Sequence, residues 1–144
     1  MDDVLKQVLQ WRQQTNGFNY YVGIRVVSIS EGASEVEADL TPEMLNPLGM
    51  AHGGMIYTLC DAAAGTAAAS RGRIAVTLTG SINYLRPGYG GTKLRGHAIE
   101  IKSGNQTAVY DVLVDDGTDR QVARATFTMF YTGKTIEDMK CLAD

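Results

Sequence analysis

The stretch NPLGMAHGGMIYTLCDAAAGTAAAS, residues 46–70, is the feature that most limits how this chain can fold. It carries one formal charge, Asp61, and the part that follows Gly53 reads as a helix that is apolar on almost every side. Such a helix must be covered by protein over nearly all of its surface. The chain therefore needs a second layer that wraps around one central helix.

Strand-like segments that can form this layer stand on both sides of the helix. Residues 22–40 alternate polar and apolar side chains around a turn at Glu31 and Gly32, which predicts a hairpin. After the helix, which we expect to end near Gly72, four segments rich in β-branched and aromatic residues are separated by short turns: 74–85, 92–103, 106–116 and 120–132. Short turns favour antiparallel neighbours. We expect an α+β protein in which a sheet of five or six antiparallel strands curls around the helix.

The chain length favours a single domain over residues 1–144. Apolar residues at helical spacing predict an N-terminal helix at about 2–14, and the core of the domain is expected at about 18–132.

Composition excludes several classes of function. A net charge of −3 without a basic stripe is unlike a nucleic-acid-binding protein. The N-terminal segment has acidic residues where a signal peptide needs basic ones, so we expect a cytoplasmic protein. Asp61 at the centre of residues 51–70 makes membrane insertion of that segment costly. Cys60 and Cys141 lack metal-ligand spacing, so we expect reduced thiols and no metal site.

The start of the central helix has the features of an oxyanion site. His52, Gly53 and Gly54 stand where a helix presents unpaired backbone N–H groups and the positive end of its dipole. Glycine removes the side chain that would keep a ligand away from those groups. A carbonyl oxygen placed against the N–H of Gly53 would be polarised. The alternative interpretation is that the two glycines only allow a tight turn.

Asp61 lies too far along the helix to act at that helix start. It follows Gly53 by eight residues, which is about 12 Å of helix at 1.5 Å per residue. Asp61 is then either a buried structural carboxylate or part of a site on another subunit. Two such helices packed antiparallel across a twofold axis would bring each Asp61 close to the partner's helix start and form two equivalent composite sites.

Three motifs together resemble a known family. They are Asn-x5-His-Gly-Gly from Asn46, an Asp eight residues after the first Gly, and a strand that ends in Leu-Arg-Pro-Gly at residues 85–88. From about Phe18 to Tyr131 the chain is similar to the hotdog-fold acyl-CoA thioesterases of the phenylacetate-pathway, or PaaI-like, branch. The resemblance implies a hotdog fold, a homodimer with continuous sheets and active sites at the dimer interface, and commonly a homotetramer.

The resemblance also implies roles for individual residues. The backbone N–H of Gly53 would bind the thioester carbonyl, with Asn46 and His52 beside it. Asp61 of the partner would act as general base or, alternatively, as nucleophile, and Thr77 would orient it. Candidate substrate-binding residues are Gly54, Thr79 and Arg86. We expect Thr79 on the same strand face as Thr77. Five basic residues can meet the phosphates of coenzyme A: Arg71, Arg73, Arg86, Lys93 and Arg95.

Most of these positions also have an ordinary structural explanation. Asn46 before a proline is a common turn residue, His52 can simply cap the loop, and Thr77 is a good strand residue.

The favoured reaction is hydrolysis of an aryl-, arylacetyl- or short- to medium-chain acyl-CoA. We expect this reaction to use no metal and no redox cofactor, and coenzyme A enters as part of the substrate. One alternative is hydration or dehydration of an acyl thioester, although the histidine and acid motifs of such enzymes are absent. The other is a non-catalytic acyl-CoA-binding regulator. The sequence does not choose among these acyl groups. Each of them fits a pocket lined by Met44, Leu48, Met50, Tyr57 or residues of the later strands.

Overall fold

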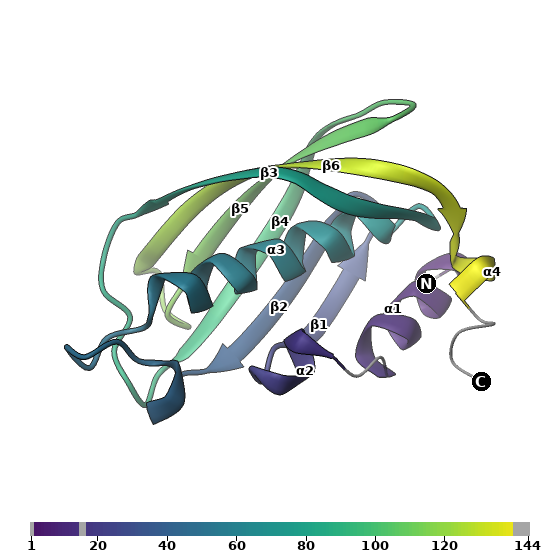
Figure 1. Ribbon diagram of the computed structural model, residues 1–144. Coiled ribbons are helices and arrows are strands. Elements are labelled where there is room, and N and C mark those ends of the chain that lie inside the picture. The colour runs from purple at the N-terminus through teal and green to yellow at the C-terminus, as the bar shows by residue number, and fades with distance from the viewer. Residues whose placement is uncertain (1, 15–16, 140–144) are drawn as a thin grey trace.

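The computed structural model describes residues 2–14 and 17–139 (Figure 1). The predicted thiol at Cys141 lies outside these residues. The elements are, in chain order, α1 (Asp3–Gln14), α2 (Phe18–Tyr21), β1 (Arg25–Ser30), β2 (Ala33–Asp39), the 3-10 helix η1 (Pro42–Met44), α3 (Gly53–Ala69), β3 (Arg73–Tyr84), β4 (Lys93–Ser103), β5 (Thr107–Asp115), β6 (Gln121–Thr135) and α4 (Ile136–Met139).

One antiparallel sheet of six strands forms the outer layer, in the order β1-β2-β4-β5-β6-β3. Figure 1 shows this sheet curving around α3. The hairpin predicted at residues 22–40 is β1 and β2. The predicted α+β architecture, with a central helix wrapped by antiparallel strands, is confirmed.

The central helix is buried along most of its length, as its apolar sequence requires. Eleven of the 17 residues of α3 are buried, and most of these are alanines or larger apolar residues. Gly96 on β4 faces the helix, where a Cβ would lie 3.1 Å from Val36 Cγ2 on β2 and 3.4 Å from Leu59 Cγ on α3, so glycine avoids crowding at this point. Within the described part of the chain, no helix is long and apolar enough to cross a membrane.

Helix α1 packs outside this core and contributes to a second, smaller apolar cluster. Val8 is fully buried there among Ile29, Ala69, Ile136 and Met139. The predicted N-terminal helix is therefore anchored against β1, α4 and the end of α3. This packing brings the last turn of α1 alongside α3, near Asp61.

Strand β3 lies at one edge of the sheet and pairs only with β6 among the described strands. Its side chains Val76 and Leu78 are 51% and 55% exposed. An unpaired strand edge with exposed apolar side chains is suited to pairing with another strand.

Candidate active site

At the N-terminus of α3, one backbone donor has no partner in the part of the chain that the structure describes. His52 is the N-cap, and its Nδ1 accepts the N–H of Gly54 at 2.9 Å. The carbonyl of His52 accepts the N–H groups of Met55 and Ile56 at 2.9 and 3.2 Å. Among the described residues, nothing accepts a hydrogen bond from the N–H of Gly53. That N–H is therefore available to a ligand, whereas the N–H of Gly54 is occupied by the cap.

Tyr84 also fixes the backbone at Gly53, through a contact that the sequence did not predict. Its hydroxyl donates to the carbonyl of Gly53 at 2.7 Å, and burial raises the pKa of Tyr84, which keeps the hydroxyl protonated. A Cβ on Gly53 would lie 3.1 Å from Tyr84 Oη, so glycine also suits this close packing. The two peptides that flank Gly53 are thus fixed, one through the His52 carbonyl and the other through Tyr84 and the His52 ring.

Asn46 and Arg86 meet Gly53 at one cavity. Asn46 Oδ1 accepts the N–H groups of Leu48 and Met50 at 2.9 and 3.1 Å, which assigns the amide and leaves Nδ2 as a donor. The cavity has a volume of about 420 Å³, and Asn46, Gly53, Tyr84 and Arg86 all line it. The structure therefore gathers an amide donor, a backbone donor and a cation around one space.

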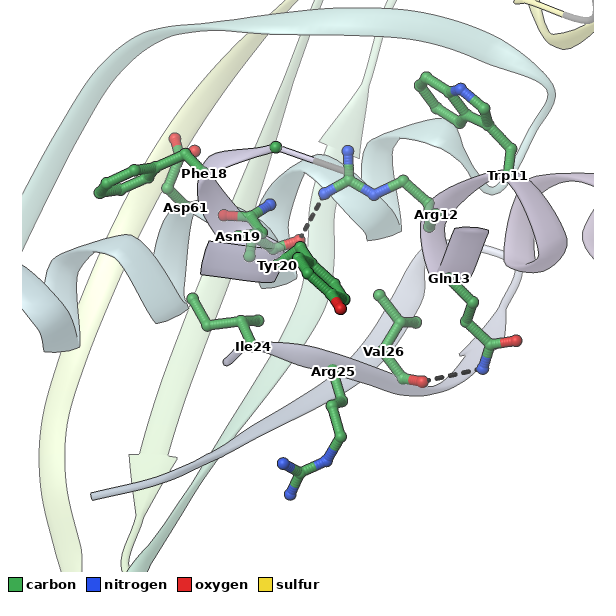
Figure 2. Close-up of a pocket in the computed structure, with 12 residues that line it drawn as sticks. Trp11, Arg12, Gln13, Phe18, Asn19, Tyr20, Ile24, Arg25, Val26 and Asp61 are labelled. Atoms are coloured by element: carbon green, nitrogen blue, oxygen red, sulfur yellow. Dashed lines mark hydrogen bonds between the residues drawn. The ribbon is translucent and has the colours of Figure 1, made fainter. Parts of the chain in front are cut away.

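Asp61 faces a different cavity, because it lies eight residues after Gly53, a little over two turns along α3. Its side chain is half-buried rather than enclosed, and its Oδ1 accepts a hydrogen bond from Thr77 Oγ1 at 2.6 Å. The second carboxylate oxygen, Oδ2, has no partner in the described part of the chain. Asp61 opens into a space of about 630 Å³ between α1, α2, β1 and α3 (Figure 2). Thr77 thus orients the carboxylate and leaves one oxygen for a water molecule or a substrate.

The prediction that Thr79 shares a strand face with Thr77 is wrong. Thr77 pairs with Met129, whose side chain is buried on the helix side, but Thr79 pairs with the next residue, Thr128, on the outer side. Two residues of β3 oppose one of β6, which is a β-bulge. The bulge reverses the alternation of side chains, so Thr79 points away from Asp61.

Arg12 is a second residue that the sequence analysis missed. Its Nε donates to Thr66 Oγ1 at 3.1 Å and its Nη2 donates to the carbonyl of Ala62 at 3.2 Å. Burial lowers the pKa of Arg12, and the charge of Asp61 partly offsets this effect. A signal was present, because Arg12 stands four residues after Val8 and so shares the buried face of α1.

Three of the other predicted basic candidates are engaged elsewhere. Arg71 pairs with Glu31 and Glu100, and Lys93 pairs with Glu37. Arg73 donates to the carbonyl of Gly104. Of the five basic candidates, Arg86 alone lines the cavity at Gly53, although its Nη1 also donates to the carbonyl of Gln121 at 3.0 Å.

The two cavities stay separate within one subunit. Gly53 and Asp61 line different spaces, and they are separated by about 12 Å of helix. No cluster of three His, Cys, Asp or Glu side chains suited to a metal ion occurs in residues 2–14 and 17–139.

Comparisons with known proteins show which family the chain resembles. The model of the thioesterase superfamily matches residues 48–123. The chain is 36% identical over 102 residues to the acyl-coenzyme A thioesterase PaaI of Escherichia coli (strain K12), which is 71% of this chain and 73% of that protein.

Solved structures give the same relationship. The structure of E. coli PaaI, from the phenylacetic acid degradation operon, superposes with a TM-score of 0.84 at 29% identity, covering 92% of this chain and 99% of that one. The protein smu.793 of Streptococcus mutans UA159, bound to acetyl CoA, superposes with a TM-score of 0.78 at 40% identity, covering 85% and 96%.

Proposed function

This chain belongs to the thioesterase superfamily, and on that premise we propose that it hydrolyses acyl-CoA thioesters to the free acid and coenzyme A. The observation that carries the proposal is the N–H of Gly53, which has no partner among the described residues and is held rigidly at a helix start. The thioester carbonyl binds there and is polarised by this N–H, by the helix dipole and by Asn46 Nδ2. These donors stabilise the negative charge that develops when water attacks.

The attacking water is activated by Asp61 of the partner subunit. About 12 Å of helix separates Gly53 from Asp61 in one subunit, which is too far for both to act on one carbonyl. The carboxylate oxygen that Thr77 does not hold takes a proton from water, or, in the less favoured variant of the mechanism, attacks the carbonyl directly. The thiolate of coenzyme A then leaves and takes up the proton that Asp61 accepted. In the nucleophilic variant the thiolate leaves a mixed anhydride on Asp61, which water hydrolyses to the free acid.

This arrangement needs a homodimer, and the edge strand β3 supports one in which the sheet continues from one subunit into the other. The free edge of β3 can pair with the same edge of a second copy, and a twofold axis there places the two α3 helices antiparallel. We further propose that dimers pair into a homotetramer. Exposed apolar side chains on the outer sheet face, at Val76, Ile99 and Phe130, support such pairing.

Coenzyme A enters as substrate, and the proposed reaction needs no metal or redox cofactor. Arg86 lines the cavity at Gly53 and is the cation that we propose for the coenzyme A phosphates. His52 contributes by capping the helix and fixing Gly54.

The direct test is steady-state release of coenzyme A thiol from phenylacetyl-, hydroxybenzoyl- and hexanoyl-CoA. We expect release from at least one of them, unchanged after dialysis of the protein against a metal chelator. The rival function, a regulator that binds acyl-CoA, predicts binding of the intact thioester and no thiol. Binding without thiol release from any member would overturn the proposal.

The composite site predicts complementation between two inactive variants. Asp61→Asn subunits and Gly53→Pro subunits each damage a different half of the site, so their heterodimer keeps one intact site. With random pairing of equal amounts, half of the dimers are mixed, and activity should recover to about a quarter of wild type. Thiol release is measured after the variants are co-expressed and purified together. Activity no higher than the mean of the separate variants would place both groups in one subunit's site.

A further inference from the structure

The cavity that contains Asp61 is large enough to hold an acyl group. Its volume is about 630 Å³, within the range of about 300–1,000 Å³ typical of small-molecule sites. Its wall comes from α1, α2, β1 and α3, as Figure 2 shows. Trp11, Phe18 and Tyr20 supply aromatic surface, and Phe18 and Tyr20 are 65% and 70% exposed. The wall thus combines this aromatic surface with one carboxylate, Asp61, and with the polar side chains of Arg12, Gln13, Asn19 and Arg25.

Arg12 puts a cation with unused donors into this wall. The acceptors on its Nε and Nη2 are neutral, a hydroxyl and a carbonyl, and within the described residues no acceptor contacts Nη1. Figure 2 shows the guanidinium reaching from α1 across the cavity toward α3. A guanidinium away from bulk water is best satisfied by an anionic acceptor that can take two parallel hydrogen bonds.

Arg25, the other cation of the wall, is already engaged. Its guanidinium pairs with Glu37 at 3.0 Å and with Asp39 at 3.4 Å, and Figure 2 shows it pointing away from Arg12. Of the two cations, Arg12 is therefore the one that can meet a ligand.

We infer that this cavity receives the acyl group of the substrate and that Arg12 selects acyl groups whose far end carries a carboxylate. The inference rests on the proposed function. A thioester carbonyl held between Asp61 and the partner's Gly53 has two substituents that diverge. The sulfur and coenzyme A extend toward the cavity with Arg86, so the acyl chain extends into the cavity on the subunit of Asp61. Its far end then meets the free donors of Arg12.

Matched pairs of thioesters that differ only at the far end test this selection. Glutaryl-, adipoyl- and pimeloyl-CoA are compared with pentanoyl-, hexanoyl- and heptanoyl-CoA, and the measured quantity is the ratio of kcat/KM within each pair. We expect wild type to favour the carboxylate in at least one pair by about 10- to 100-fold, the range for a hydrogen bond to a charged group. Arg12→Met should abolish that preference, and Arg12→Lys should keep part of it.

The ratio separates selection from structural damage, because a destabilised fold lowers kcat/KM for both thioesters of a pair by the same factor. Arg124→Met is the charge control, since Arg124 is exposed on β6 away from the cavity, and it should leave the ratio unchanged. A wild-type protein that favours the apolar member, or an Arg12→Met variant that keeps the wild-type ratio, would overturn the inference.

Failure of the proposed function can be distinguished from failure of this inference, because the two give different results. If wild type releases no thiol from any thioester, binding of adipoyl- and hexanoyl-CoA to wild type and to Arg12→Met is measured by calorimetry instead. Tighter binding of adipoyl-CoA that depends on Arg12 would support the selection even then. Equal affinity for the two thioesters would overturn it.

Discussion

Replacing Asp61 by Asn is expected to lower kcat/KM for thioester hydrolysis by about 10²- to 10⁴-fold, the usual contribution of a general base. Asparagine keeps the oxygen that accepts the hydrogen bond from Thr77 Oγ1, but its second atom is an amide nitrogen that cannot take a proton from water. Asp61→Ala should lose at least as much. Steady-state thiol release under saturating and subsaturating substrate measures both effects.

The loss should not come from unfolding, because Asp61 is half-buried and faces a cavity. The melting temperature of Asp61→Asn should stay close to that of wild type. Asp111→Asn is a matched control, since Asp111 lies on β5 with its Oδ1 near Thr126 Oγ1 at 3.4 Å, outside both cavities. It should keep wild-type activity. A well-folded Asp61→Asn protein with kcat/KM within a few-fold of wild type would show that the carboxylate is structural.

Replacing Gly53 by Pro is expected to lower kcat by about 10²- to 10³-fold, the cost of losing one oxyanion-hole donor. Proline removes the backbone N–H that makes no hydrogen bond among the described residues. It is otherwise compatible with the backbone, because Gly53 is the first helical residue and proline is favoured there. His52 also has the extended conformation, with ψ 134°, that a residue before proline prefers.

Gly53→Ala separates the lost N–H from the added side-chain bulk. Alanine keeps the N–H but places a Cβ 3.1 Å from Tyr84 Oη, a contact that proline shares. We therefore expect Gly53→Ala to lose less activity than Gly53→Pro, by about 10-fold or more in kcat. Equal losses in the two variants would assign the effect to crowding against Tyr84 rather than to the donor. Circular dichroism of both variants checks that α3 still forms.

The elements of this fold were predictable because their signals are local. A helix that is apolar on all sides must be wrapped, and alternating segments joined by short turns form an antiparallel sheet. The same local reasoning placed Gly53 at a helix start and showed that Asp61 lies too far along that helix to reach it.

The predictions that were wrong or missing concern contacts between segments that are far apart in the sequence. Thr79 was placed on the wrong face because a bulge in β3 depends on its pairing with β6, which strand alternation alone does not reveal. Tyr84 reaches the carbonyl of Gly53 only because β3 returns past the start of α3. Arg12 reaches Ala62 from a helix at the other end of the chain.

The sequence by itself therefore determined the central helix, the strands around it and the positions of the glycine and the carboxylate that we propose for the chemistry. Only the tertiary structure decided which groups hold them in place and where the cavities lie. The physical reason is that helical and strand periodicity are properties of neighbouring residues, whereas hydrogen-bond partners and cavity walls are set by how the sheet closes on the helix.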